Sequence, residues 1–122
     1  ADLARVTTVL CAPEVPCGAA SATLLSNAGV SVTPASSEQN VTAVLTKVAA
    51  GEADAGLVYA TDAVGRDDVE SVVPAGADAV VNRYPIAALT DAPNPTAAAA
   101  FVAFVLSADG QKILADAGFR AP

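Results

Sequence analysis

Apolar positions along this chain alternate between short continuous runs and helical spacing. Continuous apolar runs at residues 6–11 and 55–59 are typical of buried parallel strands. Between these runs, four apolar side chains recur at i, i+3, i+4 and i+7: Val41, Val44, Leu45 and Val48. This spacing predicts a helix over residues 41–50 with one apolar face. The alternation of strand and helix predicts an α/β fold with a βαβ-type sheet.

Turn-forming and capping residues divide the rest of the chain into further elements. Helices are predicted at residues 18–27, 95–106 and 108–117, with a single helical turn at residues 60–64. Short strands are predicted at residues 30–33, 69–73, 79–82 and 84–89. The polar segment 34–40 is predicted to be a turn. Three residues are predicted to cap the helices that follow them: Asn40, Asn94 and Ser107.

The segment C-A-P-E-V-P-C-G at residues 11–18 joins the first strand to the first helix. Pro16 restricts the backbone before it, and Gly18 is expected to let the chain approach a ligand closely. The N–H groups of Cys17 and Gly18 are expected to point outward without partners at the helix N-terminus, which suits an anion. An ordinary strand–helix connection explains the spacing equally well.

Two further positions are expected at the same edge of the sheet. Val41 begins the predicted central helix, and Tyr59 ends a buried strand. In a parallel sheet, this edge faces the ligand crevice, where a Tyr hydroxyl can donate to a ligand. Taken singly, each position also fits a purely structural role. Together with Cys17, they predict one cluster of hydrogen-bond donors.

The composition narrows the classes of function. A hydrophobic content of 53% with 16% charged residues indicates a folded chain, and the absence of His excludes His-based triads and His-based metal sites. The net charge of −7 argues against nucleic acid and anionic membranes as partners. No apolar run reaches the ~20 residues that span a bilayer. The chain begins without Met or a signal peptide and is expected to be a processed or truncated product.

Cys11 and Cys17 leave two alternatives open. In an exported protein they are expected to form a structural disulfide, and in a cytosolic protein they could be a redox pair. A low-pKa Cys17 at a helix N-terminus would attack and Cys11 would resolve. The spacing differs from C-x-x-C, and no activating Lys or His is nearby, which favours the structural disulfide.

Five segments of the chain resemble the periplasmic molybdate-binding proteins of bacterial ABC importers. They are the corner at residues 12–18, Gln39-Asn40-Val41, the block G-L-V-Y-A-T-D-A-V at residues 56–64, Tyr84-Pro85-Ile86-Ala87, and residues 107–119. The resemblance implies a type II periplasmic-binding fold, with an αβα lobe around a mixed, mainly parallel sheet. It also implies an extracytoplasmic location, in the periplasm or at the cell surface, where a lipid anchor is one alternative.

The resemblance also implies a role for individual residues. The oxyanion, molybdate or tungstate, would be held by the backbone N–H groups of Cys17 and Val41 and by the Tyr59 hydroxyl. The protein would be a binding protein and no enzyme. It would need no cofactor and no metal ligands, because molybdenum enters only as the oxyanion. Its macromolecular partners would be the membrane subunits of the importer.

The resemblance covers nearly all of this chain but only the C-terminal half of the usual family member. Residues 1–83 would form the second, ligand-binding lobe without its first hinge strand. Residues 84–122 would form a hinge return strand and helices that normally pack on the first lobe. The chain would then carry about half of the site and bind weakly. Its apolar face at Phe101, Phe104 and Val105 would favour self-association.

Three alternatives stay open at this stage. The first is a binding lobe for another anion, such as sulfate, phosphate or an organic anion. The second is a thiol oxidoreductase that uses Cys17 and Cys11. The third is an effector-sensing lobe of a transcription regulator.

Overall fold

The computed structural model of the protein describes residues 2–122 and contains two compact units, Ala1–Asn82 and Arg83–Pro122. The first unit holds the sheet, which consists of β1 (Thr8–Cys11), β2 (Ser36–Glu38) and β3 (Ala55–Gly56). The strand order is β2-β1-β3, and all three strands are parallel. This sheet, together with the helices between its strands, confirms the predicted α/β class.

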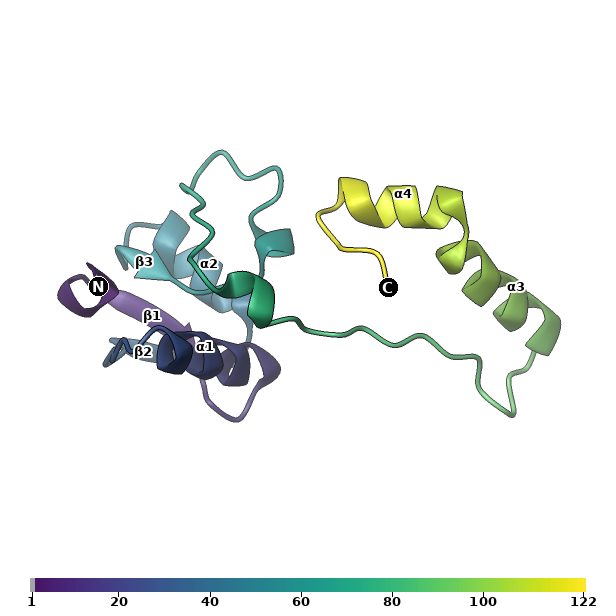
Figure 1. The fold of residues 1–122 in the computed structure, drawn as a ribbon, viewed down its shortest axis with the longest axis horizontal. Helices are drawn as coiled ribbons and strands as arrows, with labels where there is room; N and C mark the ends of the chain where they lie inside the picture. Colours follow the sequence, from purple (N-terminus) through teal and green to yellow (C-terminus); the bar gives the residue numbers. More distant parts are fainter. Residues whose placement is uncertain (1) are drawn as a thin grey trace. The chain divides into compact units, whose positions relative to one another are not determined.

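The chain crosses the sheet twice in the first unit, through α1 (Pro16–Asn27) and then α2 (Val41–Ala49) (Figure 1). The first crossover places β2 on one side of β1, and the second crossover returns to place β3 on the other side. Because parallel crossovers are right-handed, two crossovers in opposite directions put their helices on opposite faces of the sheet. The unit is therefore an αβα sandwich.

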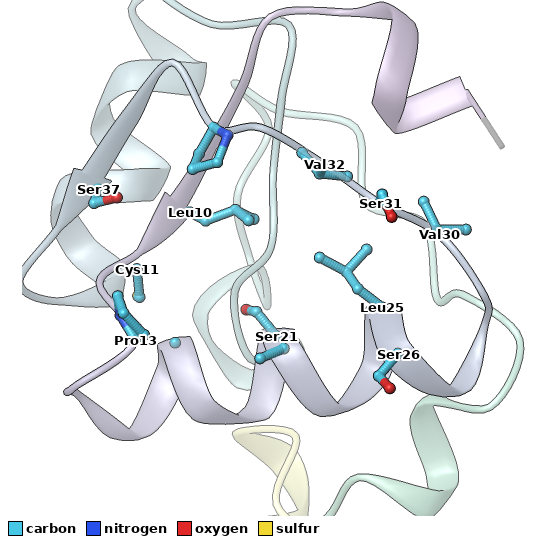
Figure 2. A pocket seen from close by; sticks show the side chains of 13 residues that line it. Leu10, Cys11, Pro13, Ser21, Leu25, Ser26, Val30, Ser31, Val32 and Ser37 are labelled. Carbon is cyan, nitrogen blue, oxygen red and sulfur yellow. The ribbon is translucent and has the colours of Figure 1, made fainter.

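The core of the first unit lies around the central strand. A buried cluster contains Val9, Cys11, Cys17, Val44 and Ala53. Gly56 of β3 lies so close to α2 that a Cβ at this position would come within 2.5 Å of Val44 Cγ1. On the opposite face of β1, Leu10 points toward Leu25 of α1 (Figure 2). The absence of a side chain at Gly56 therefore lets α2 pack closely on the sheet.

The helices follow their predicted boundaries closely. Asn40 caps α2, since its Oδ1 accepts a hydrogen bond from the Ala43 N–H at 2.9 Å. The turn at η2 (Ala60–Asp62) is also present, and the 3₁₀ elements η1 (Asp2–Arg5) and η3 (Ala77–Ala79) complete the first unit. Gly29, which follows α1, has φ +64°, as expected for a residue that ends a helix.

The strand predictions were less accurate. No strand forms at residues 30–33, 69–73, 79–82 or 84–89, and β3 is shorter than the predicted 55–59. The predicted polar turn instead contains β2, whose register pairs Val9 with Ser36. The Ala35 N–H donates to Thr8 O at 2.8 Å and so begins this pairing one residue earlier. An edge strand with a partner forms despite polar side chains, whereas an apolar run without a partner does not.

The second unit contains α3 (Pro95–Leu106) and α4 (Ala108–Asp116). Asn94 and Ser107 cap them as predicted, accepting hydrogen bonds from the N–H groups of Ala97 and Gly110 at 3.0 and 3.3 Å. Tyr84 packs edge-to-face on Phe119, with their ring centroids 5.7 Å apart. No single helix within residues 2–122 is long and apolar enough to cross a membrane. The helices α3 and α4, which are bent by 62° relative to each other, have the length and composition of a membrane-crossing segment only when they are taken together.

Candidate functional site

The carboxyl ends of the three parallel strands lie at one edge of the sheet. In the order β2-β1-β3 the chain leaves β1 on one side for β2 and then crosses to β3 on the other side. In α/β proteins ligands bind at such a point, which here lies between the ends of β1 and β3. Each strand leads into a segment that begins at this edge: α1 after β1, α2 after β2, and η2 after β3. These three segments carry the three predicted binding positions.

Cys17 is the second residue of α1 and is buried, with 7% of its surface exposed. Its N–H group donates no hydrogen bond to any residue in the described part of the chain. The Gly18 N–H, in contrast, donates to Val15 O at 3.0 Å. The prediction that both N–H groups lack partners was therefore wrong for Gly18, because the first turn of the helix already uses this donor.

Gly18 has a structural reason for lacking a side chain. A Cβ there would lie 1.9 Å from the carbonyl oxygen of Ala12. The close approach at this position is thus made by the chain's own backbone, which gives the glycine a structural reason that is independent of a ligand. Ala12 is itself tied to the edge strand, because its N–H donates to Glu38 O at 2.7 Å.

Val41 begins α2 and packs half-buried against the core cluster. Its N–H makes no hydrogen bond within residues 2–122, whereas the N–H of Ala43 is taken by the Asn40 side chain. The first turn of α2 therefore presents a backbone donor at the sheet edge, near the positive end of the helix dipole.

Tyr59 follows β3 and precedes η2, and it too packs against the core cluster. Its backbone is fixed in both directions by Asp62: the Tyr59 N–H donates to Asp62 Oδ2, and the Asp62 N–H donates to Tyr59 O, both at 3.0 Å. Its hydroxyl accepts a hydrogen bond from Asn82 Nδ2 at 3.3 Å. A phenol oxygen can accept and donate at the same time, so this contact is compatible with a donor role.

The structure thus brings the three predicted residues around one cluster. Tyr59 and Val41 pack against the cluster that contains Cys17, and α2 contacts η2 directly. The groups that they offer are two backbone N–H groups and one hydroxyl, none of which carries a formal charge. Such a set suits an anion that has no proton to donate.

The carboxylates near this edge already have partners. Lys47 of α2 forms a salt bridge with Glu38, and Ser36 Oγ donates to the same carboxylate at 2.7 Å. Hydrogen bonds from the Lys47 ammonium and then the Ser36 hydroxyl lower the pKa of Glu38. Glu14 Oε1 accepts from Gln39 Nε2 at 3.4 Å. Lys47 therefore compensates the charge of Glu38, the carboxylate on the strand beside β1.

Cys11 and Cys17 form a disulfide, with their Cα atoms 5.7 Å apart, and no free cysteine remains in the described chain. This confirms the structural pairing. The sulfur atoms belong to residues that are only 4% and 7% exposed. Burial removes the accessible, low-pKa thiol that a redox enzyme needs.

A separate hollow of about 480 Å³ lies on the α1 face of the sheet (Figure 2). Its lining joins apolar side chains, such as Leu10, Leu25 and Val32, with serines of α1 and of the segment before β2. It contains none of Cys17, Val41 and Tyr59 and no charged residue. The described residues also hold no group of three potential metal ligands. This hollow is therefore separate from the three predicted binding positions.

The hydrogen bond between Asn82 and Tyr59 was not predicted from the sequence. Asn82 falls in a predicted strand and lies 23 positions beyond Tyr59, and no spacing rule connects the two residues. Its side-chain amide is the one indication in the sequence, because Asn82 ends a short apolar run and Asn is depleted in strands.

Comparisons with known proteins agree on one family. A family model described as bacterial extracellular solute-binding protein matches residues 1–120. The molybdate-binding protein ModA of Mycobacterium bovis is 44% identical over 125 residues, which cover 100% of this chain and 48% of that protein. Molybdate-binding protein ModA from two strains of Mycobacterium tuberculosis matches with the same identity and coverage. No solved structure gives a significant match. The chain spans about half the length of the curated relatives that it matches.

Proposed function

Because the chain belongs to the bacterial extracellular solute-binding proteins, we propose that it binds molybdate or tungstate as part of the solute-binding component of an ABC importer. The oxyanion would lie at the carboxyl edge of the sheet. The Cys17 N–H, the Val41 N–H and the Tyr59 hydroxyl would donate hydrogen bonds to its oxygens. In this function the protein captures a solute and catalyses no reaction.

The observation that carries the proposal is the convergence of the three positions on one edge around one buried cluster. Neither the Cys17 N–H nor the Val41 N–H donates a hydrogen bond to any residue in 2–122. Molybdate and tungstate are dianions without a proton at neutral pH, so a wall made only of donors matches them. Phosphate keeps a proton at this pH and would also require an acceptor.

The three donors form one wall of the proposed site. The curated relatives are about twice as long as this chain, and the additional length can supply a facing wall. Each charge-assisted hydrogen bond contributes roughly 1.5–3 kcal/mol. We therefore expect this chain by itself to bind molybdate more weakly than a two-sided site does.

The disulfide and the family description support a location outside the cytoplasm, because disulfides persist in oxidising compartments. There the solute would be passed to the membrane subunits of the importer.

We also propose that the chain associates with a second copy of itself. Phe101 and Phe104 of α3 are 61% and 48% exposed, and together with Val105 they offer an apolar surface to a second copy. Sedimentation over a range of protein concentrations tests it, and a monomer throughout would contradict it.

The direct test of the site is a titration followed by residue-resolved amide spectra. Sodium molybdate, tungstate, sulfate and phosphate would be added in parallel to the nitrogen-labelled chain at constant ionic strength. We expect saturable downfield shifts of the Cys17 and Val41 amide protons with molybdate and tungstate, with little response to phosphate. Shifts confined to other residues would contradict the proposed site. A preference for sulfate would favour the alternative oxyanion.

A further inference from the structure

The first helix begins in a different way from the other three. The N-cap side chains of α2, α3 and α4 accept a hydrogen bond from their own first turn, whereas α1 begins at Val15, whose side chain cannot accept one. Among the described α-helices, α1 is thus the one without a side-chain cap. An uncapped N-terminus is normally less stable by about 1 kcal/mol.

The disulfide lies where the cap is missing. Cys11 is the last residue of β1 and Cys17 the second residue of α1, so the bond closes the corner from the strand end to the first helical turn. Both residues are buried, and hydrogen bonds also hold the corner between them, such as Val15 N–H to Ala12 O at 3.1 Å and Ala12 N–H to Glu38 O at 2.7 Å. The covalent bond is the strongest restraint on this turn.

A disulfide and a side-chain cap have different consequences for the backbone donors. A cap satisfies an N–H group of the first turn, as Asn40 does for Ala43 in α2. A disulfide restrains the turn and satisfies none. In α1, Pro16 has no N–H and the Gly18 N–H donates to Val15 O, which leaves the Cys17 N–H as the available donor of the first turn.

We propose that the Cys11–Cys17 disulfide replaces the N-cap of α1 and makes Cys11 a positioning residue, which holds the Cys17 N–H in place for the oxyanion without using up a donor. This inference rests on the function proposed above. It accounts for a covalent bond at a helix start that has no side-chain cap and whose N–H is one of the proposed donors.

The test compares the oxidised chain with the C11A/C17A double variant, which keeps every backbone N–H group. In the absence of anion, nitrogen relaxation should show lower order parameters at residues 17–19 of the variant, with residues 41–43 of α2 unchanged. In a molybdate titration, the variant should bind roughly tenfold more weakly, which corresponds to the cost of ordering about one backbone residue upon binding.

Ser21→Ala provides the matched control. The Ser21 hydroxyl donates to Cys17 O at 2.8 Å, so Ser21→Ala removes a contact to Cys17 in the same helix and leaves the disulfide and the corner intact. We expect its molybdate affinity to stay within about twofold of the unmodified chain. Unchanged order parameters in C11A/C17A, or an unchanged affinity, would overturn the positioning role. If the unmodified chain showed no molybdate-dependent shift, the proposed function would fail, and the relaxation data would still decide whether the disulfide orders the turn.

Discussion

The side-chain amide of Asn82 donates a hydrogen bond to the Tyr59 hydroxyl at 3.3 Å and so joins the end of the first unit to the residue that precedes η2. The contact restrains the phenol ring of Tyr59. The backbone of the same residue is already held by two hydrogen bonds with Asp62. A hydroxyl that is already held in one place loses little conformational entropy when it binds an anion. The contact with Asn82 would therefore strengthen the binding of an anion by Tyr59.

Tyr59→Phe should weaken molybdate binding by roughly 10- to 100-fold. The change removes one hydrogen bond to a charged ligand and keeps the aromatic ring that packs on the core cluster. The dissociation constant from the amide titration measures the effect. Tyr84→Phe is the matched control, because Tyr84 is 61% exposed and belongs to the second unit. Equal losses in both variants would show that Tyr59 has no specific role.

Asn40→Ala should destabilise the first unit by about 1 kcal/mol, because the N–H of Ala43 loses its cap. It should also weaken molybdate binding, since the first turn of α2 holds the Val41 donor. Asn94→Ala removes a cap of the same kind from α3 in the second unit. Urea unfolding followed at individual amides measures stability in each unit. The site proposal requires that only Asn40→Ala changes the molybdate titration.

Gly18→Ala should destabilise the first unit by about 3 kcal/mol, the upper end of the cost of overpacking. The new Cβ would clash with the carbonyl oxygen of Ala12. One atom belongs to the backbone and the other is bonded directly to it, so no change of side-chain rotamer can relieve the clash. Gly29→Ala is the contrasting variant, because its Cβ would meet nothing within 4 Å and only the φ of +64° opposes it. We expect it to cost about 1 kcal/mol. Similar unfolding midpoints for the two variants would contradict the close contact.

The parts of the fold that depend on neighbouring residues could be predicted from the sequence. Asn40, Asn94 and Ser107 act on amides three positions away, so the starts of three helices were predictable from local chemistry. The order of strand and helix also predicts that Cys17, Val41 and Tyr59 lie at one edge of the sheet. The positions of the candidate site follow from topology more than from details of packing.

The parts that depend on distant partners could not be predicted. The apolar run at residues 69–73 forms no strand, and Val72 and Val73 are 76% and 74% exposed. The polar Ser36–Glu38 does form one, because β1 offers it a ladder and Lys47 compensates the charge of Glu38. Strand formation requires a neighbour, and the pattern of a single segment does not show whether that neighbour exists.

The Lys47–Glu38 salt bridge predicts how the stability of the first unit depends on pH. The folded-state pKa of Glu38 is lowered, mainly by the hydrogen bond from Lys47 and then by that from Ser36. A carboxyl group with a lowered folded pKa adds stability above its unfolded pKa, and this contribution is lost as the pH falls through the folded pKa. Urea unfolding between pH about 7 and about 3 should therefore show stability that decreases toward acid.

The Glu38→Gln variant isolates this contribution. Glutamine keeps the size and one acceptor oxygen of the side chain but does not titrate in this range. Its stability should be lower than that of the unmodified chain at neutral pH, and the two should converge in acid, where Glu38 is protonated. Because the Glu38 carbonyl also holds the Ala12 N–H of the Cys17 corner, a loosened β2 should move the Cys17 amide signal as well. A pH profile of Glu38→Gln parallel to that of the unmodified chain would show that the pair does not stabilise this edge.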